Sequence, residues 1–160
     1  MKTLHKASVG TVSAGTLRTE DLLNEFHGAL ESFAFLSGDY LATDHELRDK
    51  ISNVLGKAQD CFGEDGATIL EDKQEEASEL VNETLPDYLQ LFAPPYCHFG
   101  NHPGDGADFG FWPDMESIGE LPTVEDSDGA KELGGDCKSV NDHGNVTVYG
   151  GGGSILLELV

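Results

Sequence analysis

The sequence predicts an α+β fold in which N-terminal helices pack on a small C-terminal antiparallel sheet. Apolar residues recur every three or four positions over residues 20–92, which is typical of helices, and short stretches of strand-forming residues follow over 137–160. The intervening segment is rich in glycine and proline. A chain of 160 residues fits one domain, so we expect a single core and a single domain over 1–160.

Residues 1–19 contain no apolar run of the length that a signal peptide needs. We therefore expect this segment to form an arm or a first strand. Thr19 is a candidate N-cap for a first helix that runs to about Leu36. The apolar side chains of this segment fall at spacings of three and four and should share one buried face: Leu22, Leu23, Phe26, Leu30 and Phe33.

Thr43 and Glu46 have the spacing of a capping box, which predicts a second helix from about Asp44 to Cys61. Its expected inward face consists of Leu47, Ile51, Val54, Leu55 and Ala58.

A third helix is predicted from about Ala67 to Phe92, and Pro86 should kink or restart it near Thr84 because proline cannot donate a helical hydrogen bond. Its expected inward face is Leu70, Ala77, Leu80, Val81, Leu85, Leu89 and Phe92.

Residues 93–136 predict acidic loops that are interrupted by an aromatic segment at 109–112. This segment is a candidate fourth strand of the sheet. After it, 137–141, 146–149 and 155–160 are separated by glycine-containing turns, which predicts a three-stranded antiparallel meander over 137–160. The inward side chains should be Val146, Val148, Ile155, Leu157 and Leu159.

The negative charge is concentrated in one part of the chain. Residues 58–130 contain eighteen carboxylates and one base, Lys73, so this segment carries −17 of the net charge of −21. Such a segment attracts basic surfaces and repels nucleic acid and anionic lipid, so we expect a basic protein partner, no direct nucleic-acid binding and no membrane binding. Hydrophobic residues make up 38% of the chain and include eight Phe, which excludes the class of acidic disordered proteins.

Five acidic residues of the third helix fall at spacings that place them on one helical face: Asp72, Glu75, Glu76, Glu79 and Glu83. Like charges at these spacings destabilise a helix, so a function could account for them. A row of carboxylates on a rigid scaffold resembles a phosphate backbone, and we expect these residues to contact a basic nucleic-acid-binding protein. The alternative is an ordinary solvated helix face.

A second hypothesis places a metal-binding module or a small metal-dependent enzyme at a histidine-rich loop. The candidate ligands are His98, His102, Asp105, Asp108 and His143. Paired Cys or Cys/His spacings of structural zinc sites are lacking, and turn chemistry explains Asp and Gly in such a loop. No catalytic signature occurs, so we expect neither an enzyme nor a cofactor.

The cysteines Cys61, Cys97 and Cys137 are odd in number and widely spaced, which indicates buried reduced thiols and a cytoplasmic location. No stretch reaches the roughly 20 apolar residues of a membrane span, so the sequence predicts a soluble protein.

Three segments, 15–23, 102–113 and 140–147, resemble small acidic proteins of unassigned function that phages and other mobile elements carry. The resemblance spans most of the chain and brings no catalytic residues with it. It implies an inhibitor of host restriction or CRISPR defence (an anti-restriction or anti-CRISPR protein) that acts as a nucleic-acid mimic. The identity of the partner, the oligomeric state and the source organism stay open.

Overall fold

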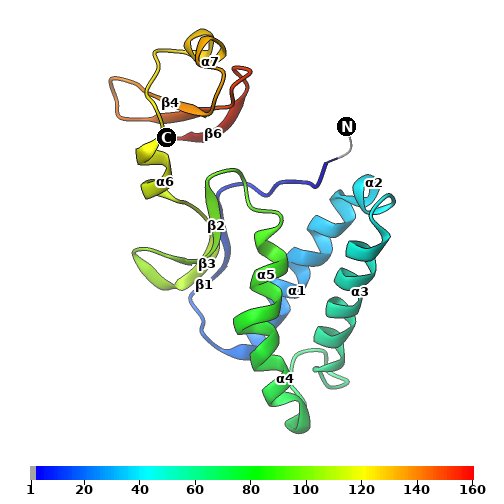
Figure 1. The fold of residues 1–160 in the computed structure, drawn as a ribbon. Helices are drawn as coiled ribbons and strands as arrows, with labels where there is room; N and C mark the ends of the chain where they lie inside the picture. The colour runs from blue at the N-terminus through cyan, green and yellow to red at the C-terminus, as the bar shows by residue number, and fades with distance from the viewer. Residues whose placement is uncertain (1–2) are drawn as a thin grey trace. The chain divides into compact units, whose positions relative to one another are not determined.

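The computed structural model describes residues 3–160 and confirms the α+β class (Figure 1). The chain forms two compact units, which we call the helical unit (residues up to 93, and 99–112) and the meander unit (94–98 and 113–160). Each unit has its own cluster of buried apolar side chains. The expectation of one core is therefore wrong, because the apolar residues of the meander pack on each other and on Cys97 and Ile118.

The first two predicted helices of the helical unit are present. Helix α1 spans Thr19–Leu36 and buries Leu22, Leu23, Phe26 and Leu30, as the periodicity predicts. A short helix α2, Gly38–Leu41, was not predicted. Helix α3 spans His45–Asp60, and its N-cap is Asp44, whose Oδ1 accepts a hydrogen bond from the Leu47 amide (3.0 Å). Thr43 is not the cap because its hydroxyl donates to the Tyr40 carbonyl (2.7 Å).

The third predicted helix consists of four successive segments: a 3-10 turn η1 (Glu71–Lys73), α4 (Gln74–Glu79), a π-helical turn η2 (Leu80–Thr84) and α5 (Leu85–Gln90). The predicted start at Ala67 is wrong, and Leu70 is 41% exposed. The irregularity expected near Thr84 takes the form of the π turn, in which the Leu85 amide bonds the Leu80 carbonyl just before Pro86.

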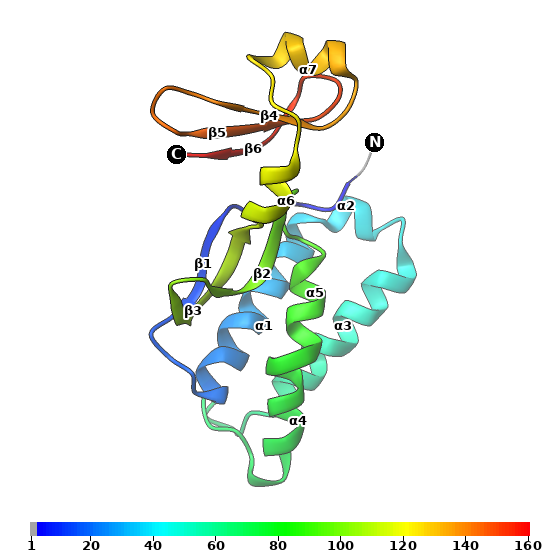
Figure 2. The same cartoon turned by 60° about the vertical axis from the view of Figure 1, so that its left-hand side comes forward.

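A three-stranded sheet lies in the helical unit except for Cys97, His98 and Pro113, which belong to the meander unit. Its strands are β1 (Gly10–Ala14), β2 (Cys97–His102) and β3 (Asp105–Pro113), in the order β1-β3-β2. The aromatic segment 109–112 is thus the middle of this separate sheet and does not form a fourth strand of the meander. The sheet lies beside α1, and the Phe26 ring meets Phe99 and Phe109 edge-on (Figure 2).

The meander unit contains the predicted antiparallel strands β4 (Cys137–Val140), β5 (Val146–Tyr149) and β6 (Ile155–Leu159). Val148 and Leu157 are buried as expected, but Ile155 is 57% exposed because the β5–β6 register shifts after Val148.

Segment 93–136 contains two short helices that were not predicted, α6 (Met115–Glu120) and α7 (Ser127–Leu133). Asp114 and Asp126 cap them, each accepting hydrogen bonds from two backbone amides. Cys61, Cys97 and Cys137 are buried and form no disulfide with one another. Within residues 3–160, no helix is both long enough and apolar enough to cross a bilayer.

Candidate partner-binding surface

The five predicted contact residues all lie on the helical segment 71–90 and differ in their surroundings. Four of them are exposed: Asp72, Glu75, Glu79 and Glu83. On the inner side of the same segment, Ala77, Leu80 and Val81 are almost completely buried. This inner side packs against α1, so the core fixes the orientation of the exposed carboxylates.

Glu76 differs from the other four because it is engaged within the protein. Its carboxylate accepts a hydrogen bond from Lys73 Nζ (2.6 Å), and both side chains are about two-thirds buried. This hydrogen bond holds the pKa of Glu76 below its usual value, with a smaller contribution from Lys57. The surface available to a basic partner is therefore the four remaining residues, which we call the acidic surface (Asp72, Glu75, Glu79 and Glu83).

The spacing of this surface departs from that of a regular α-helix. Glu75 and Glu79 are four residues apart within α4 and occupy one face. Asp72 lies in the 3-10 turn and Glu83 in the π turn, where the number of residues per turn is not 3.6. The prediction from a uniform helical period thus describes the centre of the row and not its two ends.

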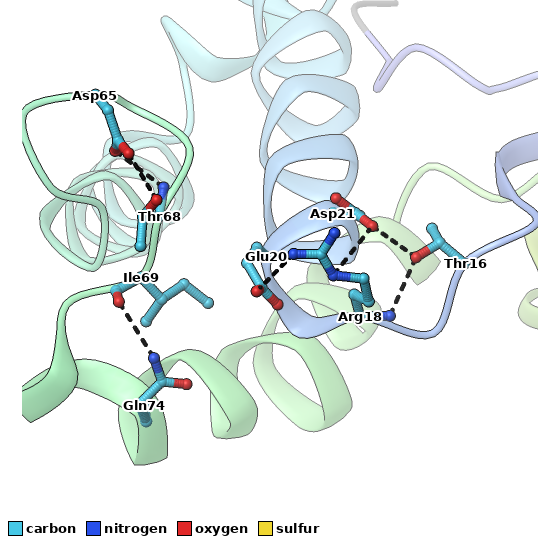
Figure 3. Close-up of polar contacts among 8 residues, drawn as sticks. All are labelled: Thr16, Arg18, Glu20, Asp21, Asp65, Thr68, Ile69 and Gln74. Atoms are coloured by element: carbon cyan, nitrogen blue, oxygen red, sulfur yellow. Dashed lines mark hydrogen bonds and ion pairs between the residues drawn. The ribbon is translucent and has the colours of Figure 1, made fainter.

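The loop before this segment adds carboxylates and is tightly organised (Figure 3). The amide of Leu70 bonds the Cys61 carbonyl (2.9 Å), which closes residues 61–70 into a turn. Within it, Asp65 accepts hydrogen bonds from the Thr68 hydroxyl (2.6 Å) and from the amides of Thr68 and Ala67. These bonds, that of the Thr68 hydroxyl first, lower the pKa of Asp65 to about 2. An Asp followed three residues later by Thr is a signal for this turn, and the prediction of a helix from Ala67 overlooked it.

The start of α1 carries a second set of polar contacts (Figure 3). Arg18 pairs with Glu20 (3.0 Å) and lies 4.0 Å from Asp21, which also accepts a hydrogen bond from the Thr16 hydroxyl (2.7 Å). The backbone amide of Glu20 and the Arg18 guanidinium lower the pKa of Glu20, so this carboxylate stays ionised. Arg18 is thereby neutralised by its neighbours.

Few of the carboxylates between residues 58 and 130 are compensated. Among residues 3–160, ion pairs within 4.0 Å involve only two of them, Glu76 with Lys73 and Asp128 with Lys131. Of the eighteen carboxylates, sixteen therefore have no such cationic partner. The concentration of acid in the sequence is thus also a concentration of uncompensated charge.

The alternative metal ligands are distributed over both units. His98 and His102 lie on β2 and Asp105 and Asp108 on β3, whereas His143 lies in the turn between β4 and β5. No group of three or more His, Cys, Asp or Glu side chains that could hold a metal occurs within residues 3–160. The hypothesis of a metal centre built from these five residues therefore gains no support from the described side chains and stays a prediction.

Local structure accounts for several of these side chains. The His102 ring stands edge-on against Trp112 (4.6 Å between centroids), and its Nδ1 accepts a hydrogen bond from the Gly104 amide (3.0 Å). Asp105 accepts a bond from the Ala107 amide (3.0 Å) in the β2–β3 turn. The amide of His143 donates to Asn141 Oδ1 (2.9 Å). Asp108 is the exception, because its Oδ1 is buried without a hydrogen-bond partner among the described residues.

Comparisons with known proteins add no functional assignment. No protein-family model and no curated protein matches the sequence, and no solved structure matches the fold.

Proposed function

We propose that this chain is a non-enzymatic inhibitor that occupies the nucleic-acid-binding surface of a basic host defence protein, in the manner of anti-restriction or anti-CRISPR proteins. The observation that carries the proposal is the acidic surface, four exposed carboxylates without ion-pair partners among residues 3–160, on a segment whose other side is buried.

The energetics favour a role for these charges outside the fold. Carboxylates three or four residues apart on a helix repel one another by some tenths of a kcal/mol per pair, so Glu75 and Glu79 reduce the stability of their own segment. Of the row from Asp72 to Glu83, the part from Glu75 to Glu79 lies within the regular helix α4 and, at about 1.5 Å per residue, covers roughly 6 Å. A protein that binds DNA mainly through phosphate contacts could accept such a row, because those contacts depend on charge and not on base sequence.

The net charge of −21 also favours a basic protein as the partner. Nucleic acid is repelled by this charge, whereas a basic channel attracts it and association is accelerated at low salt. The partner in this proposal is therefore a protein with a positively charged groove, and the chain itself binds no nucleic acid.

The test uses the chain immobilised on beads and a nuclease-treated lysate of the host, eluted with rising salt. A captured protein is then assayed for binding to labelled DNA with increasing amounts of the chain. We expect the chain to displace DNA, and the displacement to weaken steeply with salt. Capture of a protein that keeps its DNA in the presence of excess chain would contradict the mimicry.

The decisive variant reverses three charges of the acidic surface, E75K/E79K/E83K. A matched control makes the same change in net charge at three exposed positions of the meander unit, E132K/D142K/E158K. The first variant should lose binding and the second should retain most of it, since only the first replaces phosphate-like contacts by repulsive ones. Circular dichroism must show that both are folded. Equal binding by the two variants at about 0.15 M salt would refute the role of the acidic surface.

A further inference from the structure

The helical unit contains two adjoining hollows beside α1. The first, of about 380 Å³, lies between β1, the first turns of α1 and Gly66–Ala67. The second, of about 350 Å³, continues along α1 toward the end of α3. Asn24 and Gly66 line both hollows, so we treat them as one trough. Figure 3 shows Glu20 and Asp21 at the start of α1 and the loop of Asp65.

The walls of the trough carry hydrogen-bond acceptors and negative charge. Glu20, Asn24 and His27 follow one another at spacings of four and three, which places them along one face of α1 over about 10 Å. Glu25 and Glu64 add carboxylates that take part in no ion pair within residues 3–160. The described lining residues include no Lys or Arg, but Arg18 pairs with two of the lining carboxylates, Glu20 and Asp21, so the uncompensated charge is that of Glu25 and Glu64.

Ser13 provides an independent indication of a ligand. This residue lines the first hollow and is only 5% exposed, and its hydroxyl makes no hydrogen bond to any described residue. It pairs in register with Phe109, whose ring packs on Phe26 of α1, so its side chain lies on the side of β1 that faces α1 and the hollow. The hydroxyl oxygen is not sealed from solvent, since among the described residues only Asp108 Oδ1 is a fully buried side-chain atom without a partner, so the partner of the Ser13 hydroxyl comes from what fills the hollow. A ligand with N–H donors would supply one here.

We propose that the trough binds an organic cation with a primary ammonium or guanidinium group. Such a group has three to five N–H donors, which match the Ser13 hydroxyl, the Asn24 amide oxygen and the Glu25 carboxylate. Phe62 lines the second hollow, and an aromatic ring beside a cation attracts its positive charge. A metal ion fits less well, because no three potential ligands converge within residues 3–160. This site is independent of the protein partner proposed above.

The test is a titration of the ¹⁵N-labelled protein with agmatine and with putrescine at about 0.15 M NaCl, followed by NMR and calorimetry. We expect saturable shifts of the amides of Ser13, Asn24 and Gly66 at millimolar ligand or below. Ser13→Ala and Glu25→Gln should each weaken agmatine binding about tenfold or more, because each loses one hydrogen bond to a charged group. Glu31→Gln, at an exposed position of α1 that does not line the trough, should leave it unchanged.

One further ligand, N-acetylarginine amide, distinguishes the sources of the cation. If N-acetylarginine amide binds as tightly as agmatine, the trough accepts a side chain of another protein, and if only the free amines bind, its ligand is a small polyamine. Both results support the proposal. It is overturned if none of these cations binds, if Mg²⁺ or butane-1,4-diol shifts the same amides equally, or if Glu31→Gln weakens binding as much as Glu25→Gln.

Discussion

Truncation of Phe26 is the sharpest test of how the helical unit is held together. Its side chain is completely buried, and its ring centroid lies 5.1 Å from that of Phe99 and 5.5 Å from that of Phe109. Phe26 therefore joins α1 to both β2 and β3. Its removal should destabilise the whole helical unit, because two of the three aromatic pairs between α1 and the sheet involve this ring, the third being Phe33 with Phe111.

The magnitude follows from burial and ring geometry. Phe26→Ala should lower the free energy of unfolding by about 3–5 kcal/mol through lost burial and the cavity that remains. Phe26→Leu keeps most of the apolar volume and loses two edge-on ring contacts of about 0.5–1.5 kcal/mol each, so about 1–3 kcal/mol is expected. The ratio of the two effects separates burial from aromatic geometry.

The assay is urea unfolding followed by tryptophan fluorescence. Trp112 is the single tryptophan of the chain, lies on β3 and donates from Nε1 to the Gly100 carbonyl (3.0 Å), so its emission reports on this sheet. Phe35→Ala is the matched control, because Phe35 lies on the same helix and is 85% exposed; a change within about 0.5 kcal/mol is expected. If Phe26→Ala and Phe35→Ala unfold at the same urea concentration, the assignment of the core is refuted.

Three further outcomes are expected. Val148→Ala and Leu157→Ala should each destabilise the meander unit by about 1–4 kcal/mol in thermal unfolding monitored by circular dichroism, and melting like the parent protein would place these strands outside the core. The melting temperature should rise between about 0.01 M and 0.15 M NaCl, because the Debye length falls from about 30 to 8 Å; indifference to salt would contradict crowding of uncompensated carboxylates. Asp65 has a pKa of about 2 in the folded chain, below its value when unfolded, so its stabilising bonds are intact above about pH 4 and are lost as the pH falls toward 2. Asp65→Asn should flatten this part of the pH dependence of the melting temperature, and an unchanged pH profile would count against the turn.

The helices could be predicted because their signal is local. The spacing of Leu22, Phe26 and Leu30 is read within a few turns, and these residues are buried on the predicted face of α1. Helix boundaries were less predictable, as at Thr43, because neighbouring residues compete for the same backbone donors. The caps Asp114 and Asp126 show the same difficulty, since Asp in a glycine-rich segment predicts a turn as readily as a helix start.

The pairing of strands could not be read from the sequence. Segment 109–112 is a strand as predicted, but its neighbour β1 lies roughly a hundred positions earlier in the chain, with Ser13 opposite Phe109. Alternation of side chains shows which residues share a face and says nothing about which strand lies alongside. The β1-β3-β2 sheet, and with it the core of the helical unit, could therefore be recognised only from the tertiary structure.

For the candidate site, the sequence by itself determined the amount and the location of the charge, since eighteen carboxylates and one base in residues 58–130 need no structure to count. The tertiary structure decided which of these charges are exposed, because it turned Glu76 toward Lys73 and left Glu75 and Glu79 without ion-pair partners among the described residues. It also formed the trough by bringing the loop at Gly66 against β1 and α1, which lie some forty to fifty positions earlier in the chain. A helical period is set by bonds four residues apart, whereas an ion pair or a hollow depends on packing between distant segments.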